Sequence, residues 1–153
     1  MTNRLAVSRI QLSDFRCYES LRLSLDTAPV VLTGPNGAGK TNLLEAVSLL
    51  SPGGGLRRAK LGEMARNVPV SDDGAPRAWA VSAQLTTPDG DYQVGSGLDP
   101  TALAQGRERR AVRIDGENQR GQASLGRVCA AVWLTPQMDR LFLDGPSARR
   151  RFL

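Results

Sequence analysis

A glycine-rich stretch between two apolar runs constrains this chain more than any other feature. The stretch "GPNGAGKT" meets the pattern G-x-x-x-x-G-K-[ST] through Gly34, Gly39, Lys40 and Thr41. Glycines in such a loop let the backbone turn tightly and point consecutive N–H groups inward, which creates a concave site of positive potential for a polyphosphate. At a glycine frequency of about 7%, the four fixed positions coincide by chance in roughly one per cent or less of chains of this length. The stretch therefore predicts a phosphate-binding loop.

The segments that flank the loop predict a strand before it and a helix after it. Residues 29–33, "PVVLT", are almost continuously apolar, as in a short strand that is buried on both faces. Apolar residues then recur with helical spacing from Leu43 to Leu50, and Pro52 with the following glycines predicts the end of the helix. The amino terminus of this helix would add its partial positive charge to the phosphate site.

ATP and Mg²⁺ are the cofactors that this arrangement predicts. Lys40 is expected to reach the terminal phosphates, and the Thr41 hydroxyl is expected to bind Mg²⁺. The predicted nucleotide contacts are Gly34, Pro35, Asn36, Gly37, Ala38, Gly39, Lys40, Thr41 and Asn42.

Hydrolysis would also require a carboxylate for the metal and a group that positions the attacking water. The nearest matches to an apolar run that ends in Asp are "LFLD" at Asp144 and "VRID" at Asp115. The first run is short and is followed by Gly-Pro, and the second contains an arginine and precedes a turn. We therefore predict binding of ATP by this chain without a catalytic residue for its hydrolysis.

The remaining sequence predicts an antiparallel β-region. Residues 4–15 and 20–26 alternate with period two, which predicts two half-buried strands joined by a turn at 17–20. A hairpin pattern and one further strand give a β-rich part at about 77–116. The apolar run at 127–135, "RVCAAVWLT", predicts another strand.

Composition excludes several function classes. The chain carries 20 Lys and Arg against 15 Asp and Glu, a net charge of +5 that favours contact with polyanions. It has no histidine, which excludes Ser/His/Asp and Cys/His catalysis and any histidine-ligated metal within these 153 residues. Cys17 and Cys129 belong to no C-x-x-C pair, and no run approaches the ~18 apolar residues of a membrane span. A soluble cytoplasmic protein without membrane contact is predicted.

Three stretches together resemble the amino-terminal part of the RecF family of bacterial recombination mediators, ABC-type ATPases related to the SMC proteins. They are "FRCY" at 15–18, "GPNGAGKTNLLEAV" at 34–47 and "DGPSARRRFL" at 144–153. The resemblance implies an α/β fold, namely a P-loop lobe like that of an ABC-ATPase head, with a mixed sheet and an antiparallel β-region. Residues 1–153 would be the ATP-binding lobe (lobe I) of a longer protein and thus an incomplete domain. Family members carry the signature and Walker B sequences later in the chain, and two heads dimerise to complete each ATP site.

The resemblance also implies roles for basic residues and for one glutamine. Arg16 would lie near the nucleotide, Arg57 and Arg58 would belong to an arginine loop that faces ATP or DNA, and Gln137 would be a Q-loop residue that helps to hold the metal. The cations expected to bind DNA without reading its sequence are Arg57, Arg58, Lys60, Arg107, Arg109 and Arg110. The implied partners are DNA at single/double-strand junctions and the proteins RecR and RecO, which help to load the recombinase RecA in DNA replication, recombination, repair and the SOS response.

Other P-loop proteins remain as alternatives. The nucleotide-binding domain of an ABC transporter is disfavoured because "TNLL" follows the lysine where transporters more often have "TTLL", and because their Q-loop comes sooner than Gln137. Another SMC-like ATPase head is also possible. A P-loop kinase or small GTPase is expected to show a base-recognition motif such as N-K-x-D, which is absent. A non-catalytic module is the fourth alternative.

Overall fold

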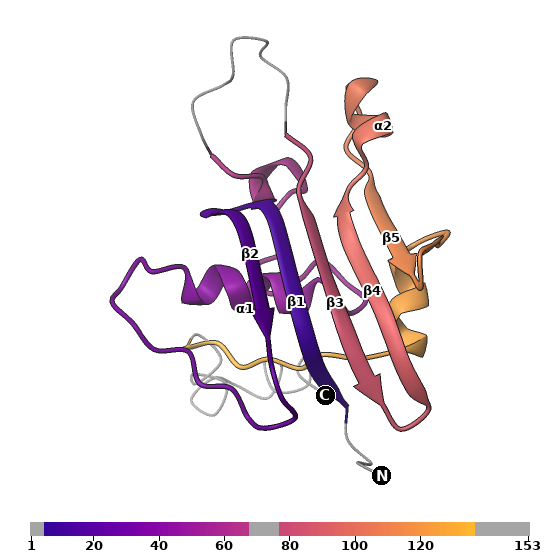
Figure 1. The fold of residues 1–153 in the computed structure, drawn as a ribbon. Helices are drawn as coiled ribbons and strands as arrows, with labels where there is room; N and C mark the ends of the chain where they lie inside the picture. Colours follow the sequence, from indigo (N-terminus) through magenta and orange to yellow (C-terminus); the bar gives the residue numbers. More distant parts are fainter. Residues whose placement is uncertain (1–4, 68–76, 137–153) are drawn as a thin grey trace, which may run out of the picture.

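The protein is described by a computed structural model, in which residues 5–67 and 77–136 are placed. They form a six-stranded antiparallel sheet with the order β2-β1-β3-β4-β5-β6. The main helix, α1, lies across one face of this sheet (Figure 1). No helix in the described part is long and apolar enough to cross a membrane. Gln137, Asp144 and the stretch 144–153 lie outside the described residues.

The elements follow the predicted α/β pattern. The strands are β1 (Ala6–Phe15), β2 (Tyr18–Ser24), β3 (Ala80–Thr87), β4 (Gly90–Leu98), β5 (Arg110–Ile114) and β6 (Glu117–Asn118). The helices are α1 (Lys40–Ser48) and α2 (Pro100–Ala104), with 3-10 turns η1 (Gly62–Met64) and η2 (Gln122–Arg127). The predicted β1 and β2 strands, the β3–β4 hairpin and the α1 helix are thus confirmed, and β1 and β2 join the β-rich part at 77–116 in one sheet.

Tight turns fix the register of the neighbouring strands. Arg16 and Cys17 connect β1 to β2, because Phe15 is paired with Tyr18. The turn therefore lies earlier than the predicted position at 17–20. Between β3 and β4, Thr87 is paired with Gly90, so that a two-residue loop makes the hairpin.

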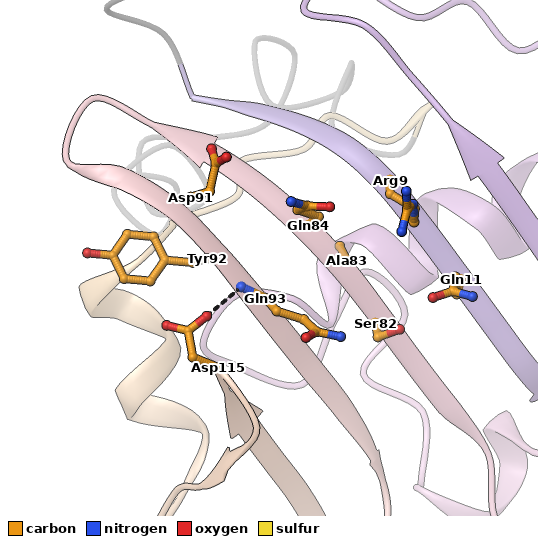
Figure 2. A pocket seen from close by; sticks show the side chains of 9 residues that line it. All are labelled: Arg9, Gln11, Ser82, Ala83, Gln84, Asp91, Tyr92, Gln93 and Asp115. Carbon is orange, nitrogen blue, oxygen red and sulfur yellow. Dashed lines mark hydrogen bonds between the residues drawn. The ribbon is translucent and has the colours of Figure 1, made fainter.

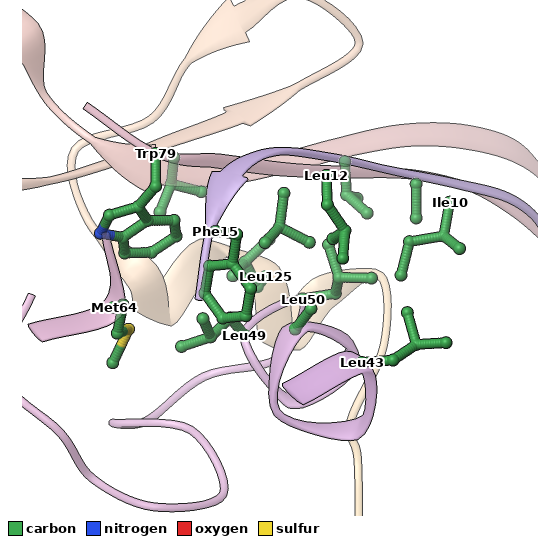
Figure 3. Close-up of a cluster of buried hydrophobic side chains, with 14 of the residues drawn as sticks. Ile10, Leu12, Phe15, Leu43, Leu49, Leu50, Met64, Trp79 and Leu125 are labelled. Atoms are coloured by element: carbon green, nitrogen blue, oxygen red, sulfur yellow. The ribbon is translucent and has the colours of Figure 1, made fainter. Parts of the chain in front are cut away.

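The hydrophobic core fills the space between the sheet and α1 (Figure 3). The alternating residues Ile10 and Leu12 point from β1 toward Leu43 and its neighbours on the helix. At one end of the core, the Phe15 and Trp79 rings meet edge to face with their centroids 5.4 Å apart. The Trp79 indole N–H donates to the Leu61 carbonyl at 2.7 Å, so this large side chain is buried without losing its hydrogen bond.

Two predicted strands are wrong. Residues 29–33 form no strand, and neither do residues 128–135, although both segments are rich in apolar side chains. In the part of the chain that the structure describes, neither segment pairs with the sheet, whose edges are β2 and β6. Val31 and Val132 are accordingly 82% and 87% exposed.

These two segments dominate an exposed apolar surface. All large hydrophobic side chains that are exposed in the described part come from them, from the chain before β1 or from α1: Leu5, Val30, Val31, Leu44, Val132 and Leu134. A groove lined by Leu5, Leu44 and Val47 runs between the helix and the segment 25–32. Apolar continuity in the sequence thus correctly indicates segments suited to burial, but nothing in the described residues covers them.

Replacing Phe15 by alanine is expected to destabilise the fold by about 3–5 kcal/mol, because the ring is fully buried and its removal leaves a cavity beside Trp79. Chemical denaturation followed by tryptophan fluorescence measures the change. Val132→Ala is the control, since an exposed side chain should alter the free energy of unfolding by less than about 0.5 kcal/mol. Equal effects of the two substitutions would contradict this core.

Candidate nucleotide-binding site

The glycine loop joins the end of the apolar segment 29–33 to the first residue of α1. Gly34, Gly37 and Gly39 have φ angles of 140°, 84° and 93°, values that L side chains rarely adopt. Gly39 is the residue that caps the amino terminus of α1, so the backbone N–H groups of the first helical turn face the loop. The predicted strand before the loop is missing, but the loop and the helix form the phosphate-binding arrangement itself.

Lys40 folds back over the loop. Its ammonium group donates to the carbonyl of Gly34 at 2.6 Å and to that of Pro35 at 2.7 Å. The positive charge therefore lies at the start of the loop, where it can add to the N–H groups and to the helix terminus. Thr41, the next residue, is exposed in the first turn of the helix. Both residues thus lie at the loop, and their roles in binding phosphate and Mg²⁺ stay predictions.

The turn between β1 and β2 forms a wall against the last residue of the loop. The Tyr18 hydroxyl donates to the Gly39 carbonyl at 3.2 Å, and the Asn42 amide donates to the Cys17 thiol at 3.2 Å. A Cβ atom at Gly39 would lie 2.7 Å from the Tyr18 oxygen and 2.8 Å from the Cys17 sulfur. Burial, with a smaller contribution from Cys17, raises the pKa of Tyr18. Glycine is therefore required at position 39 for two reasons: any Cβ there would clash with Tyr18 and Cys17, and the φ angle is positive.

A buried carboxylate lies beneath this wall. Glu45 on α1 has no exposed surface and accepts two hydrogen bonds from Arg16, from Nη2 at 2.7 Å and from Nε at 2.8 Å. It also accepts one from Arg57 Nη1 at 3.0 Å, and the same nitrogen donates to Asn42 at 2.9 Å. We call Arg16, Asn42, Glu45 and Arg57 the Glu45 cluster.

Arg16 and the loop that carries Arg57 are each held by further contacts. Arg16 has a φ angle of 53°, and its Nη1 donates to the Glu63 carbonyl at 2.7 Å. The Leu56 N–H donates to the Ser48 hydroxyl at 2.7 Å, which ties the arginine loop to the end of α1. The structure thus brings the predicted residues Arg16 and Arg57 together beside the phosphate loop.

Sequence reasoning missed Cys17, Tyr18 and Glu45 as parts of this site. All three belong to the stretches "FRCY" and "TNLLEA", so their positions are signalled, but spacing alone does not show that a strand turn packs on a helix start. A glutamate at a helix position that faces the core is the stronger signal, because such a residue requires cationic partners.

The other predicted cations lie in different environments. Arg58 and Lys60 are exposed in the loop after α1, and Arg107 and Arg109 are exposed between α2 and β5. Arg110 instead points inward from β5. It donates to the carbonyls of Leu49, Ser51 and Gly53, to the Ser96 hydroxyl and to Gln122.

Arg110 therefore caps the carboxyl end of the phosphate-loop helix, where orphan carbonyls attract a cation. Burial lowers its pKa from the ordinary value. The guanidinium of Arg110 donates to groups of the protein itself. Arg110 therefore differs from the four exposed cations, whose side chains face solvent.

The chemistry of the site suits Mg²⁺ bound together with a nucleotide. In residues 5–67 and 77–136, no three His, Cys, Asp or Glu side chains converge to form a metal cage. Magnesium bound with a nucleotide requires only one or two protein oxygens, because phosphates and waters complete its octahedron. The exposed Thr41 hydroxyl at the loop fits that limited requirement.

A second hollow lies on the opposite face of the sheet (Figure 2). Its volume is about 270 Å³, and its lining includes Arg9, Gln84 and Asp91. The Asp115 carboxylate at its rim accepts from the Gln93 backbone N–H at 2.8 Å. The side chains around it spread along the outer, polar face of the strands, away from the phosphate loop, and they form no part of the candidate site.

The fold and the loop define a P-loop nucleotide-binding lobe. The family model described as "AAA domain" matches residues 9–124, and the chain belongs to that family. The resemblance to RecF is also confirmed. The chain is 47% identical over 156 residues to the "DNA replication and repair protein RecF" of Caulobacter sp. (strain K31), with 98% of this chain and 38% of the relative covered.

The RecF of Rhizobium meliloti (strain 1021) is likewise 47% identical, over 154 residues that cover 100% of this chain and 38% of the relative. The chain thus spans about 38% of the length of the curated relatives that it matches.

Solved structures show the same fold. One described as the "recombination mediator protein RecF-ATP" superimposes with a TM-score of 0.76 and 21% identity, over 97% of this chain and 38% of that one. A chain from a study of SMC ATPases superimposes with a TM-score of 0.69 and 14% identity, over 95% of this chain and 96% of that one. The predicted class, an α/β lobe with an antiparallel region like that of an ABC-type head, is therefore confirmed. The predicted mixed sheet is not seen in the described residues, where all strand pairs are antiparallel.

Gly39→Ala is expected to lower the melting temperature more than Gly37→Ala. Both substitutions place a side chain at positive φ, which costs about 1–2 kcal/mol. Only the Cβ at position 39 meets neighbours, and this overpacking adds about 1–3 kcal/mol. Thermal unfolding of both variants measures the difference. Indistinguishable melting temperatures would show that the wall does not contact the loop as described.

Proposed function

We propose that this chain is the ATP-binding lobe of a RecF-type DNA replication and repair protein. One observation carries the proposal: Lys40 and the amino terminus of α1 converge on a glycine loop that is walled by the "FRCY" turn. The identity to RecF proteins, 47% in the Caulobacter protein, supports the choice of this family over a transporter, kinase or GTPase.

The loop would bind the phosphates of ATP through its N–H groups and Lys40. Charge-assisted hydrogen bonds contribute roughly 1.5–3 kcal/mol each, so four or five of them suffice for the ~8 kcal/mol of micromolar binding before the cost of ordering. The nucleotide contacts are residues 34–42, with Arg16 beside them, and Thr41 would hold Mg²⁺. When bound, Mg²⁺ would offset the negative charge of the phosphates.

Hydrolysis would also need a carboxylate that binds the metal. In the part of the chain that the structure describes, the Glu45 carboxylate beside the loop is fully buried and paired with Arg16 and Arg57. We propose that the chain binds ATP without hydrolysing it, and that dimerisation of two heads of the longer protein completes each site. The SMC structure that shares this fold is described in terms of "ATP-driven dimerization and DNA stimulated activation of SMC ATPases". This description supports the proposed dimerisation. Gln137 remains the proposed Q-loop residue.

DNA binding would use exposed cations without reading bases. Arg58 and Lys60 follow α1, and Arg107 and Arg109 precede β5; all four side chains are exposed. Such side chains can neutralise phosphates and release counterions. We further propose that the longer protein acts in the cytoplasm at gapped DNA with RecR and RecO, where it helps to load recombinase during repair.

Lys40→Ala is expected to weaken the binding of a fluorescent ATP analogue about tenfold or more, because a charge-assisted contact to the phosphates is lost. Equilibrium titration with Mg²⁺ measures the affinity. Arg9→Ala is the matched control, since it removes one positive charge from the opposite face of the sheet. Phosphate release should be the same for the wild-type chain and for Lys40→Ala. Lys40-dependent turnover would contradict the proposal that the chain binds ATP without hydrolysing it.

The affinity for junction DNA is expected to fall with salt and to be independent of sequence. A variant with Arg107→Gln and Arg109→Gln removes two phosphate contacts, so the slope of log K against log salt should become shallower by about 1.8. Fluorescence anisotropy at several salt concentrations measures it. The control is Arg22→Gln with Arg113→Gln, which removes two exposed charges from the outer sheet face. Equal slopes for the two double variants would exclude the α2–β5 loop as a DNA contact.

A further inference from the structure

Glu45 is the one charged residue that is buried among the described residues. Burying a carboxylate is costly unless cations and hydrogen bonds compensate it. A hydrophobic residue at this position of α1 would pack in the core without that cost. The retained charge therefore calls for an explanation beyond the packing of the helix.

The two arginines that contact Glu45 do so in different ways. Arg16 meets the carboxylate side-on through Nε and Nη2, and a third nitrogen binds the Glu63 carbonyl. Its side chain is 19% exposed, and its backbone N–H donates to the Met64 carbonyl at 2.8 Å. Arg16 is thus a fixed counter-charge.

Arg57 is held at one nitrogen. Its Nη1 donates to Glu45 and to Asn42, and its side chain is 42% exposed. Its Nε and Nη2 make no hydrogen bond or ion pair within residues 5–67 and 77–136. Nε and Nη2 form the edge of a guanidinium that can bind a phosphate with two parallel hydrogen bonds.

The anchors of Arg57 lie in the first turns of the phosphate-loop helix. Asn42 directly follows Thr41, and Glu45 lies three positions later on the same face of α1. Arg57 is therefore held by side chains of the same helix that begins at Lys40.

We propose that Glu45 is a positioning residue, which holds Arg57 by Nη1 so that its Nε–Nη2 edge is presented to the phosphate tail of a bound nucleotide. Arg16 supplies the counter-charge that the buried carboxylate of Glu45 requires. The inference rests on the proposed nucleotide binding and assigns to that site a carboxylate that never touches the ligand.

Charge and position predict opposite effects when Glu45 is changed. If Glu45 acted only through its charge, Glu45→Gln would make the site more positive and ATP binding would tighten. If Glu45 orients Arg57, the same substitution releases the guanidinium and ATP binding weakens, although a negative charge has been removed. Glu45→Asp keeps the charge but withdraws the carboxylate by one methylene, so it should also weaken binding.

The test is a double-mutant cycle on the purified chain, with ATP and Mg²⁺ as the ligand. We expect Arg57→Gln to weaken ATP about tenfold and Glu45→Gln about three- to tenfold, in line with the loss of a charge-assisted contact. In the Arg57→Gln background, Glu45→Gln should change the affinity less than about twofold, because the two residues act as one unit. Melting temperatures of all variants are measured in parallel.

Several outcomes would overturn the inference. One is tighter or unchanged ATP binding in Glu45→Gln. Another is an equal loss of ATP affinity on Glu45→Gln in the wild-type and Arg57→Gln backgrounds, which would indicate a purely structural role of Glu45. If Glu45→Gln does not fold, Glu45→Asp takes its place in the same cycle with the same expectations. Failure of the proposed function would look different, because the wild-type chain would then show no Lys40-dependent binding of ATP at all.

Discussion

The side-on ion pair between Arg16 and Glu45 joins the two halves of this lobe. Arg16 stands in the turn of the sheet's first hairpin, and Glu45 stands on the phosphate-loop helix, 29 positions later in the chain. Their contact holds the hairpin turn against the start of the helix. At that place, a residue with a Cβ at position 39 would clash with Tyr18 and Cys17, so only glycine fits. The shape of the phosphate loop therefore depends on a pairing between distant segments, in addition to the glycines themselves.

The carboxyl end of the helix is fixed by a second arginine. Arg110 reaches from β5 to the carbonyls that α1 leaves unpaired, and the arginine loop is tied to Ser48 nearby. The helix is thus held to the sheet by Arg16, which binds Glu45 in its second turn, and by Arg110 at its carboxyl end, in addition to the core. Its outward side, with Leu44 and the segments at 29–33 and 128–135, forms an apolar surface suited to burial. The curated relatives that the chain matches are more than twice as long as this chain.

Much of this arrangement could be predicted from local patterns. Period-two alternation correctly predicts β1, β2 and the later hairpin, and the glycine pattern with its flanking helix predicts the site, because both signals lie within a few neighbouring residues. The runs at 29–33 and 127–135 were misassigned because apolar continuity reports suitability for burial and not the presence of a pairing partner. The Glu45 cluster could not be predicted from spacing, since it depends on how a strand turn packs against a helix. Arg110 likewise looked like a surface cation, and only the fold shows that it caps α1.

We expect the polyphosphate tail of a nucleotide, held by the loop at the start of α1, to contribute most of the binding affinity. The most direct measurement is competition against a fluorescent ATP analogue by inorganic tripolyphosphate and by adenosine, each with Mg²⁺. We predict that tripolyphosphate displaces the analogue and that adenosine does so only at far higher concentration. Displacement by adenosine but not by tripolyphosphate would contradict it.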